Sequence, residues 1–139
     1  MRRRVVVGVV VLAIGAIAGA TAFALPDGDA QPRTIEVVMR YSRFEPAPIE
    51  VEPGETVRFV VRNDDPIDHE FILGDAAVQR AHERGTEAYH PPRPGEMSVA
   101  PLATAVTTYT FPASAGTLVL GCHLPGHFAY GMRAEVRIG

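Results

Sequence analysis

Residues 118–138 read LVLGCHLPGHFAYGMRAEVRI, two alternating apolar stretches on either side of a segment rich in glycine and histidine. The apolar positions that share a face are Leu118, Leu120 and Cys122 in the first stretch, and Ala134, Val136 and Ile138 in the second. A period of two is typical of β-strands with one face in a core. This stretch therefore predicts two strands joined by a loop that runs from Cys122 to Met132.

The same alternation recurs earlier in the chain. Its apolar positions are Ile35, Val37, Met39, Val57, Phe59 and Val61. Turn-forming residues separate the predicted strands at Pro53-Gly54, at 63–66 and at 113–116. Many short strands with such turns indicate an all-β fold, an antiparallel sandwich or barrel of Greek-key type. Met39 and Met97 fall on strand positions, and we expect both in the core.

A long connection, residues 73–99, interrupts the strands. Asp75 is a good helix N-cap, helix formers follow it, and Gly85 suits the position just after a helix end. We expect a short helix here, then an extended loop with three prolines over residues 89–95. A strand pattern returns over 97–111 with a break near Pro101. One role for the insertion is to cover a sheet edge.

The 139 residues allow one domain, which we place at residues 34–139. Residues 26–33 combine proline, glycine and acidic residues and predict a flexible linker. The formal net charge is −3 although three arginines open the chain, so the remainder is clearly acidic. This balance argues against nucleic acid as a partner and favours a partner with a basic docking patch.

The first 25 residues predict a signal peptide or an N-terminal membrane anchor. Residues 5–25 carry no charge, follow three arginines, and as a helix would span about 31 Å. Ala22 and Ala24 flank Phe23 in a pattern that resembles a signal cleavage site. Cleavage and retention stay open. Both alternatives place the domain outside the cytoplasm, periplasmic or at the cell surface, and retention adds membrane association through residues 5–25.

The chain's single cysteine excludes an internal disulfide and needs another explanation outside the cytoplasm. Cys122, His127 and Met132 follow one another at intervals of five residues. Thiolate, imidazole and thioether together are the ligands of a copper ion that cycles between Cu(I) and Cu(II). A trigonal site needs a second histidine, and His69 sits at what is expected to be the same end of the sandwich. The sequence therefore predicts one mononuclear copper site.

The chain resembles the cupredoxins, the type 1 blue copper proteins of the plastocyanin, auracyanin and rusticyanin type. The resemblance covers essentially residues 33–139. It rests on the early strands at 44–59, on Asn63 followed by His69, and on the Cys-x4-His-x4-Met spacing of the loop. It implies a Greek-key β-sandwich with His69, Cys122 and His127 as equatorial copper ligands and Met132 as a weak axial ligand.

Other residues near the predicted site carry further expectations. Many small blue copper proteins have asparagine after the first histidine ligand, whereas this chain has Glu70, whose carboxylate would alter the potential or compete as a ligand. We expect an apolar surface around His127, made by Leu124, Pro125, Phe128 and Tyr130, through which electrons would pass. We expect His123 to be an exposed loop residue. Whether it or His82 and His90 bind a second metal stays open.

Two functional classes follow. The first is a monomeric, extracytoplasmic one-electron carrier between a redox donor and a redox acceptor, which catalyses no reaction itself. The second is a copper-handling protein, a periplasmic chaperone or tolerance factor, in which the additional histidines would assist capture and release. A multicopper enzyme is disfavoured because the chain has only five histidines. No nucleophile triad, paired-carboxylate or phosphate-loop signature is present.

Overall fold

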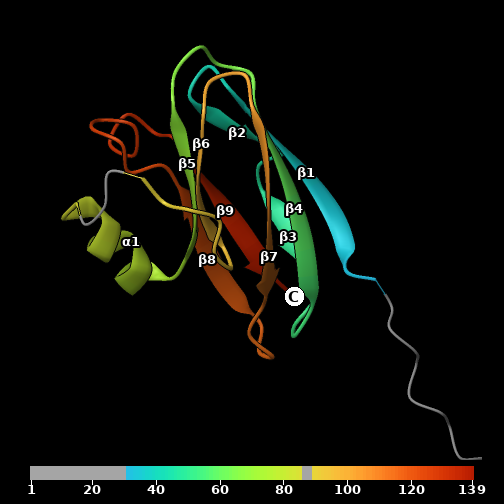
Figure 1. Cartoon of the computed structure of the whole chain (residues 1–139). Helices are drawn as coiled ribbons and strands as arrows, with labels where there is room; N and C mark the ends of the chain where they lie inside the picture. Colours follow the sequence, from blue (N-terminus) through green and yellow to red (C-terminus); the bar gives the residue numbers. More distant parts are fainter. Residues whose placement is uncertain (1–30, 86–88) are drawn as a thin grey trace, which may run out of the picture. The chain divides into compact units, whose positions relative to one another are not determined.

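The computed structural model describes residues 31–85 and 89–139, and residues 31–139 form one compact unit (Figure 1). The predicted signal peptide or anchor and residues 26–30 of the predicted linker lie outside the described residues, whereas Arg33, the last residue of the predicted linker, already belongs to β1 (Arg33–Arg40). Within the described part of the chain no helix is long and apolar enough to cross a membrane.

Two β-sheets pack face to face and confirm the predicted all-β sandwich. The first has the order β2 (Arg43–Glu45), β1 (Arg33–Arg40), β4 (Thr56–Asn63) and β7 (Thr104–Thr110). The second has the order β3 (Ile49–Val51), β9 (Arg133–Ile138), β8 (Gly116–Gly121), β5 (His69–Gly74) and β6 (Glu96–Val99). The break near Pro101 is therefore real and separates β6 from β7.

The sandwich is mixed rather than purely antiparallel. β1 pairs with β4 in parallel, and β3 pairs with β9 in parallel, whereas the other strand pairs are antiparallel. The reason is the connection between β1 and β4, which passes through β2 in one sheet and β3 in the other. Strand periodicity alone carries no information on this pairing.

The core lies between the sheets and is formed by the predicted apolar faces. Phe59 of β4 and Phe71 of β5 are fully buried, with ring centroids 5.2 Å apart across the sandwich. Phe111 completes the contact at 6.4 Å from Phe59. Met39 and Met97 are buried as predicted. Burial of each large apolar side chain stabilises the fold by about 1.5–3 kcal/mol.

The insertion contains the predicted helix, α1 (Ala76–Glu83). Asp75 Oδ1 accepts the N–H groups of Ala77 and Val78 at 2.8 and 3.0 Å, and Gly85 takes a positive φ of 70° after the helix end. Buried Gln79 Nε2 donates to the carbonyls of Ile72 and Val119. These bonds fix α1 against β5 and β8, as Figure 1 shows.

Candidate metal centre

The loop between β8 and β9 is held by its own backbone. Cys122 N–H donates to the Met132 carbonyl at 3.2 Å, and Met132 N–H donates to the His127 carbonyl at 2.9 Å. His127 N–H closes a turn on the Leu124 carbonyl at 2.9 Å. Backbone hydrogen bonds therefore connect the three predicted ligands of this loop without a metal.

The structure brings three of the four predicted ligands together. His127 Nδ1 lies 3.2 Å from Cys122 Sγ and 3.2 Å from His69 Nδ1, and the three ligand atoms all lie within 4.8 Å of one another. In tetrahedral or trigonal geometry two nitrogen ligands bound at about 2.0–2.1 Å are about 3.3–3.6 Å apart, and a sulfur bound at about 2.3 Å is about 3.5–3.8 Å from each nitrogen. A thiol and two imidazoles at these separations fit a copper ion.

Met132 is fully buried, and its backbone is bonded to the same loop. Its position directly before β9 is compatible with the axial role implied by the resemblance. That role remains a prediction.

His69 is fixed by an acidic residue that the sequence reasoning missed. Asp65 Oδ2 lies 2.8 Å from His69 Nε2, so Nε2 holds the proton and Nδ1 presents its lone pair toward His127. Asp65 also accepts the N–H groups of Tyr41 and Ser42, both at 2.8 Å. These two residues have φ near 50°, a conformation uncommon for non-glycine residues.

The pKa of Asp65 is lowered although burial alone would raise it, because the bonds from Ser42, His69 and Tyr41 stabilise the carboxylate. Asp65 therefore links the β1–β2 turn to the candidate ligand. The signal available in the sequence was its position in the Asn63-Asp64-Asp65-Pro66 turn, four residues before His69.

Asn63 organises the same region. Its Nδ2 donates to the carbonyls of Ile67 at 2.7 Å and of Val99 and Ala100 at 3.1 Å, while its Oδ1 accepts Asp65 N–H at 2.9 Å. This buried amide joins the segment before β5 to the segment after β6. The entry of His69 into β5 is thereby fixed in space.

Cys122 is fully buried, and Glu70 N–H donates to its sulfur at 3.3 Å. Burial raises the pKa of the thiol to about 11, although the backbone N–H groups of Glu70 and Leu124 lower it. Metal binding must therefore displace a thiol proton. Burial lowers the pKa of His127, and the neighbouring His69 adds to the effect, which favours the neutral ring that a metal requires.

The Glu70 carboxylate is engaged with other groups. Its Oε2 accepts His123 N–H at 3.0 Å, and its Oε1 lies 3.4 Å from His90 Nε2. The backbone N–H of this position still reaches the sulfur, as it would with asparagine. The departure from the asparagine pattern thus leaves the thiol contact in place and adds a buried carboxylate behind it.

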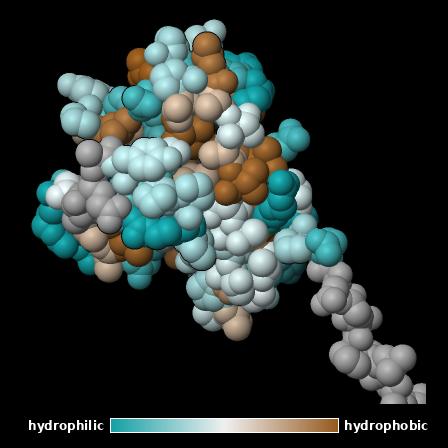
Figure 2. Space-filling model, viewed as in Figure 1, coloured by the Kyte–Doolittle hydropathy of each residue, from teal (hydrophilic) through white to brown (hydrophobic). Residues whose placement is uncertain are grey.

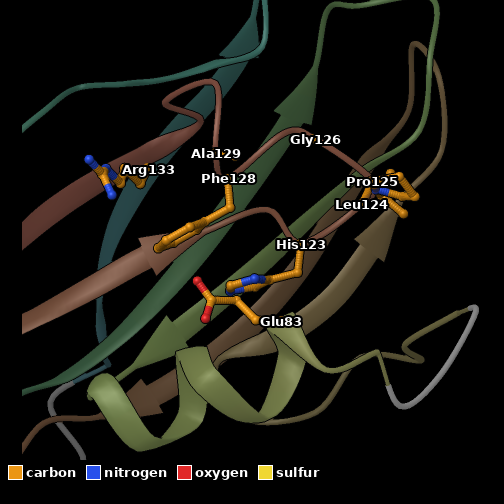
Figure 3. Close-up of a pocket in the computed structure, with 8 residues that line it drawn as sticks. All are labelled: Glu83, His123, Leu124, Pro125, Gly126, Phe128, Ala129 and Arg133. Carbon is orange, nitrogen blue, oxygen red and sulfur yellow. The ribbon is translucent and has the colours of Figure 1, made fainter.

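His123 is half-buried, so the expectation of an exposed loop residue was wrong. Its ring stacks on Phe128 at 4.6 Å with an interplanar angle of 17°, and its Nε2 lies 2.7 Å from Gln79 Oε1 on α1. Burial is the main cause that lowers the pKa of His123, and the nearby His82 lowers it further. Figure 3 shows His123 and Phe128 among the residues that line a pocket between this loop and α1. This contact with the helix has no signal in the sequence.

A family model described as cupredoxin-like domain matches residues 9–90, more than half of the chain. The matched segment contains His69 and ends before the Cys122 loop. The chain belongs to the cupredoxin family, and copper is its cofactor.

Two curated relatives are both named copper-resistant cuproprotein CopI. The protein of Rubrivivax gelatinosus is 42% identical over 108 residues, which cover 75% of this chain and 65% of the relative, just under two thirds of its length. The protein of Pseudomonas aeruginosa is 32% identical over 84% of this chain and 82% of the relative.

Solved structures share the fold. Auracyanin B matches with a TM-score of 0.63 and 20% identity, covering 78% of this chain and 91% of the other. Auracyanin A, a blue copper protein from Chloroflexus aurantiacus, matches with a TM-score of 0.61 and 24% identity, covering 78% of this chain and all of the other. These comparisons confirm the cupredoxin fold predicted from the sequence.

Proposed function

We propose that the chain is a mononuclear type 1 copper protein that carries single electrons between redox partners outside the cytoplasm. His69, Cys122 and His127 are the equatorial ligands, and Met132 is the axial ligand. The observation that carries this proposal is the convergence of one thiol and two imidazoles, each ligand atom within 4.8 Å of the others, at a buried site. Copper bound there supplies a couple that gains and loses one electron.

The residues around the ligands restrict their movement. Asp65 holds the His69 ring by a 2.8 Å bond, and Glu70 N–H holds the Cys122 sulfur at 3.3 Å. Cu(I) and Cu(II) prefer different geometries, so ligands that are held by the sandwich favour electron exchange with little atomic rearrangement. This property supports electron transfer rather than catalysis on a bound substrate.

The optical spectrum of the copper-loaded protein tests the type of site. We expect an intense thiolate-to-Cu(II) band that disappears in Cys122→Ser and on reduction by one electron per chain. The His69→Ala variant should also lose the band. A Cu(II) protein that lacks the band, or a Cys122→Ser variant that keeps it, contradicts the proposal.

The surface around His127 is the proposed route for electrons. Leu124 is half-buried, Pro125 is exposed, and Tyr130 is 83% exposed. Phe128 contributes less than expected, because its ring packs between His123 and the guanidinium of Arg133, 5.4 Å from the ring centroid. A mainly acidic chain with this apolar surface suits a partner with basic residues around an apolar contact.

Copper tolerance is a second candidate, and the names of the two CopI relatives favour it. In this role the chain would bind copper outside the cytoplasm and pass it on. Mixing the copper-loaded protein with an apo acceptor and counting the metal in each separates the two roles. An electron carrier should keep its copper through many cycles of reduction and oxidation. A copper-handling protein should pass its copper to the apo acceptor within the time of those cycles.

The proposed location rests on the N-terminal segment. We propose export through residues 1–25, either with cleavage near Ala24 or with retention as an anchor, and a monomeric domain thereafter. Cell fractionation followed by N-terminal sequencing tests this. A mature protein that begins after Ala24 indicates cleavage, full-length protein in the membrane fraction indicates retention, and a cytoplasmic protein contradicts both.

A further inference from the structure

We propose that His82, His90 and Glu96 form a second metal site, which binds a divalent transition-metal ion with Cu(II) as the ion of highest affinity. One ligand atom from each residue lies within 4.8 Å of the other two. None of these residues belongs to the candidate centre of His69, Cys122 and His127. The second site therefore stands independently of the function proposed for that centre.

The three residues come from elements that the fold fixes. His82 lies in the last turn of α1, and Glu96 begins β6, the edge strand of the second sheet. His90 is bound to the same strand: its N–H donates to Ser98 Oγ at 2.9 Å, and Ser98 N–H donates to its carbonyl at 2.8 Å. A metal here would connect the helix to the sheet edge.

The hydrogen bond of His82 leaves one ring nitrogen suited to a metal. Its Nδ1 lies 2.9 Å from the Val78 carbonyl, which can only accept, so Nδ1 carries the proton of the neutral ring. Its Nε2 therefore presents a lone pair, 3.9 Å from Glu96 Oε2. That distance is too long for a hydrogen bond. Histidine ligands commonly donate their other N–H to a carbonyl in this way.

His90 completes the cluster from its buried side. Its ring centroid lies 5.0 Å from that of His82, and its side chain is 3% exposed. Arg93 Nη2 approaches Nδ1 at 3.2 Å and can only donate, so the neutral ring carries its proton on Nε2, which lies 3.4 Å from Glu70 Oε1. Ligation through Nε2 therefore requires the ring proton to move to Nδ1 and the contact of Nδ1 with Arg93 to open.

An unused nitrogen lies beside the cluster. Gln79 uses its amide N–H groups on backbone carbonyls, so its Oε1 accepts the Nε2–H of His123. His123 Nδ1 is left buried and without a hydrogen-bond partner among the described residues. The His123 ring centroid is 5.7 Å from that of His82. This third imidazole lies beside the proposed ligands but outside the group whose ligand atoms are all within 4.8 Å of one another.

The donor set indicates the class of metal. Two imidazoles and a carboxylate, without sulfur, suit Cu(II) and Zn(II) and disfavour Cu(I), and the general affinity order places Cu(II) highest. In tetrahedral geometry with bonds of about 2.0–2.1 Å the ligand atoms are about 3.3 Å apart, so they would approach one another by up to about 1.5 Å. The side chains of His82 and Glu96 are 10% and 25% exposed, which leaves room for this adjustment.

Metal counting on the full chain tests the proposal. The protein is first loaded with one copper per chain, so that the Cys122 centre is filled, and is then dialysed against CuSO4 or ZnCl2 in separate experiments. We expect one further ion per chain, and for Cu(II) an electron paramagnetic resonance signal without added thiolate absorption. His82→Gln and Glu96→Gln should each weaken this second binding at least tenfold while the thiolate band is unchanged.

Glu83→Gln is the matched control, because Glu83 is exposed on α1 directly after His82. Zn(II) should raise the melting temperature of the copper-loaded wild type and of Glu83→Gln, but not of His82→Gln. A wild type that takes up no second ion overturns the proposal. Undiminished second binding in both His82→Gln and Glu96→Gln overturns it as well, because the three residues would then serve only to anchor the insertion.

Discussion

At the scale of single residues, the candidate centre depends on the burial of Cys122 and on the hydrogen bond that orients the His69 ring. Burial keeps Cys122 protonated in the metal-free protein, with a pKa of about 11. The Asp65 carboxylate shows the opposite shift, because its hydrogen bonds lower its pKa. Each of these groups leads to a prediction.

The Cys122 thiol should make the metal-free protein less stable at alkaline pH. Its pKa in the folded state exceeds the ordinary value of 9.0, so the stability it contributes is present below pH 9 and is lost as pH rises from 9 toward 11. Two pKa units correspond to about 2–3 kcal/mol. Urea unfolding at pH 8 and pH 10.5 measures the part of this loss that falls below the folded pKa, about 2 kcal/mol, and this part should be absent in Cys122→Ser. An equal loss in both proteins contradicts the assignment.

Asp65→Asn should weaken both the fold and the copper site. The neutral amide forms weaker bonds to the N–H groups of Tyr41 and Ser42, and the loss of a charged acceptor typically costs about 1.5–3 kcal/mol. Copper affinity should fall about 10–100-fold, as when other partners of histidine ligands are changed. Competition with a chelator measures it. Asp68→Asn, an exposed neighbour of His69, is the control and should match the wild type.

At the scale of elements, two connections carry the chemistry. The β8–β9 loop presents the candidate ligands, and the insertion with α1 packs against β5 and β8 beside it. The face seen in Figure 2 is mostly hydrophilic or neutral, with separate hydrophobic areas. A local apolar contact on the loop is therefore a better candidate for docking than the face seen in Figure 2.

Leu124→Glu should slow electron exchange with a redox partner about tenfold or more, because a charge would be desolvated in the apolar contact next to His127. Stopped-flow kinetics measures the rate, and the optical spectrum should not change. Ala115→Glu is the control, since this exposed residue precedes β8 at the end opposite Cys122. Equal rates for the two variants would remove the loop surface from the proposed route.

At the scale of the whole molecule, the sandwich supports the site without needing the metal. The core joins both sheets through aromatic contacts, above all those of Phe59 with Phe71 and Phe111. We therefore expect the metal-free protein to be folded, and copper to add stability by binding only the folded state.

Phe59→Ala should cost about 3–5 kcal/mol of unfolding free energy in the metal-free and the copper-loaded protein alike. The remaining folded protein should keep the thiolate band, because Phe59 lies in the core and not among the ligands. Urea unfolding with and without copper measures both effects, and Phe59→Leu should be milder. A spectrum altered by Phe59→Ala would show that the core and the centre are coupled.

The sequence by itself determined the helix and the long strands, and it indicated the candidate ligands. The stretches before Cys122 and after Met132 alternate apolar and polar residues, a pattern that forms β-strands when one face packs on a core. Asp75 and Gly85 mark the two ends of a helix, because Asp75 caps its first N–H groups and Gly85 can adopt a positive φ after its last turn. Thiol, imidazole and thioether at fixed spacing also favour copper as the metal. These properties depend on near neighbours in the chain.

Only the tertiary structure decided which distant groups meet. The parallel pairing of β1 with β4, the bond of Asp65 to His69 and the contact of His123 with α1 join segments through the packing of two sheets. The cluster of His82, His90 and Glu96 likewise exists because α1 folds back on the edge strand β6. Such contacts follow from the global arrangement, which local periodicity does not encode.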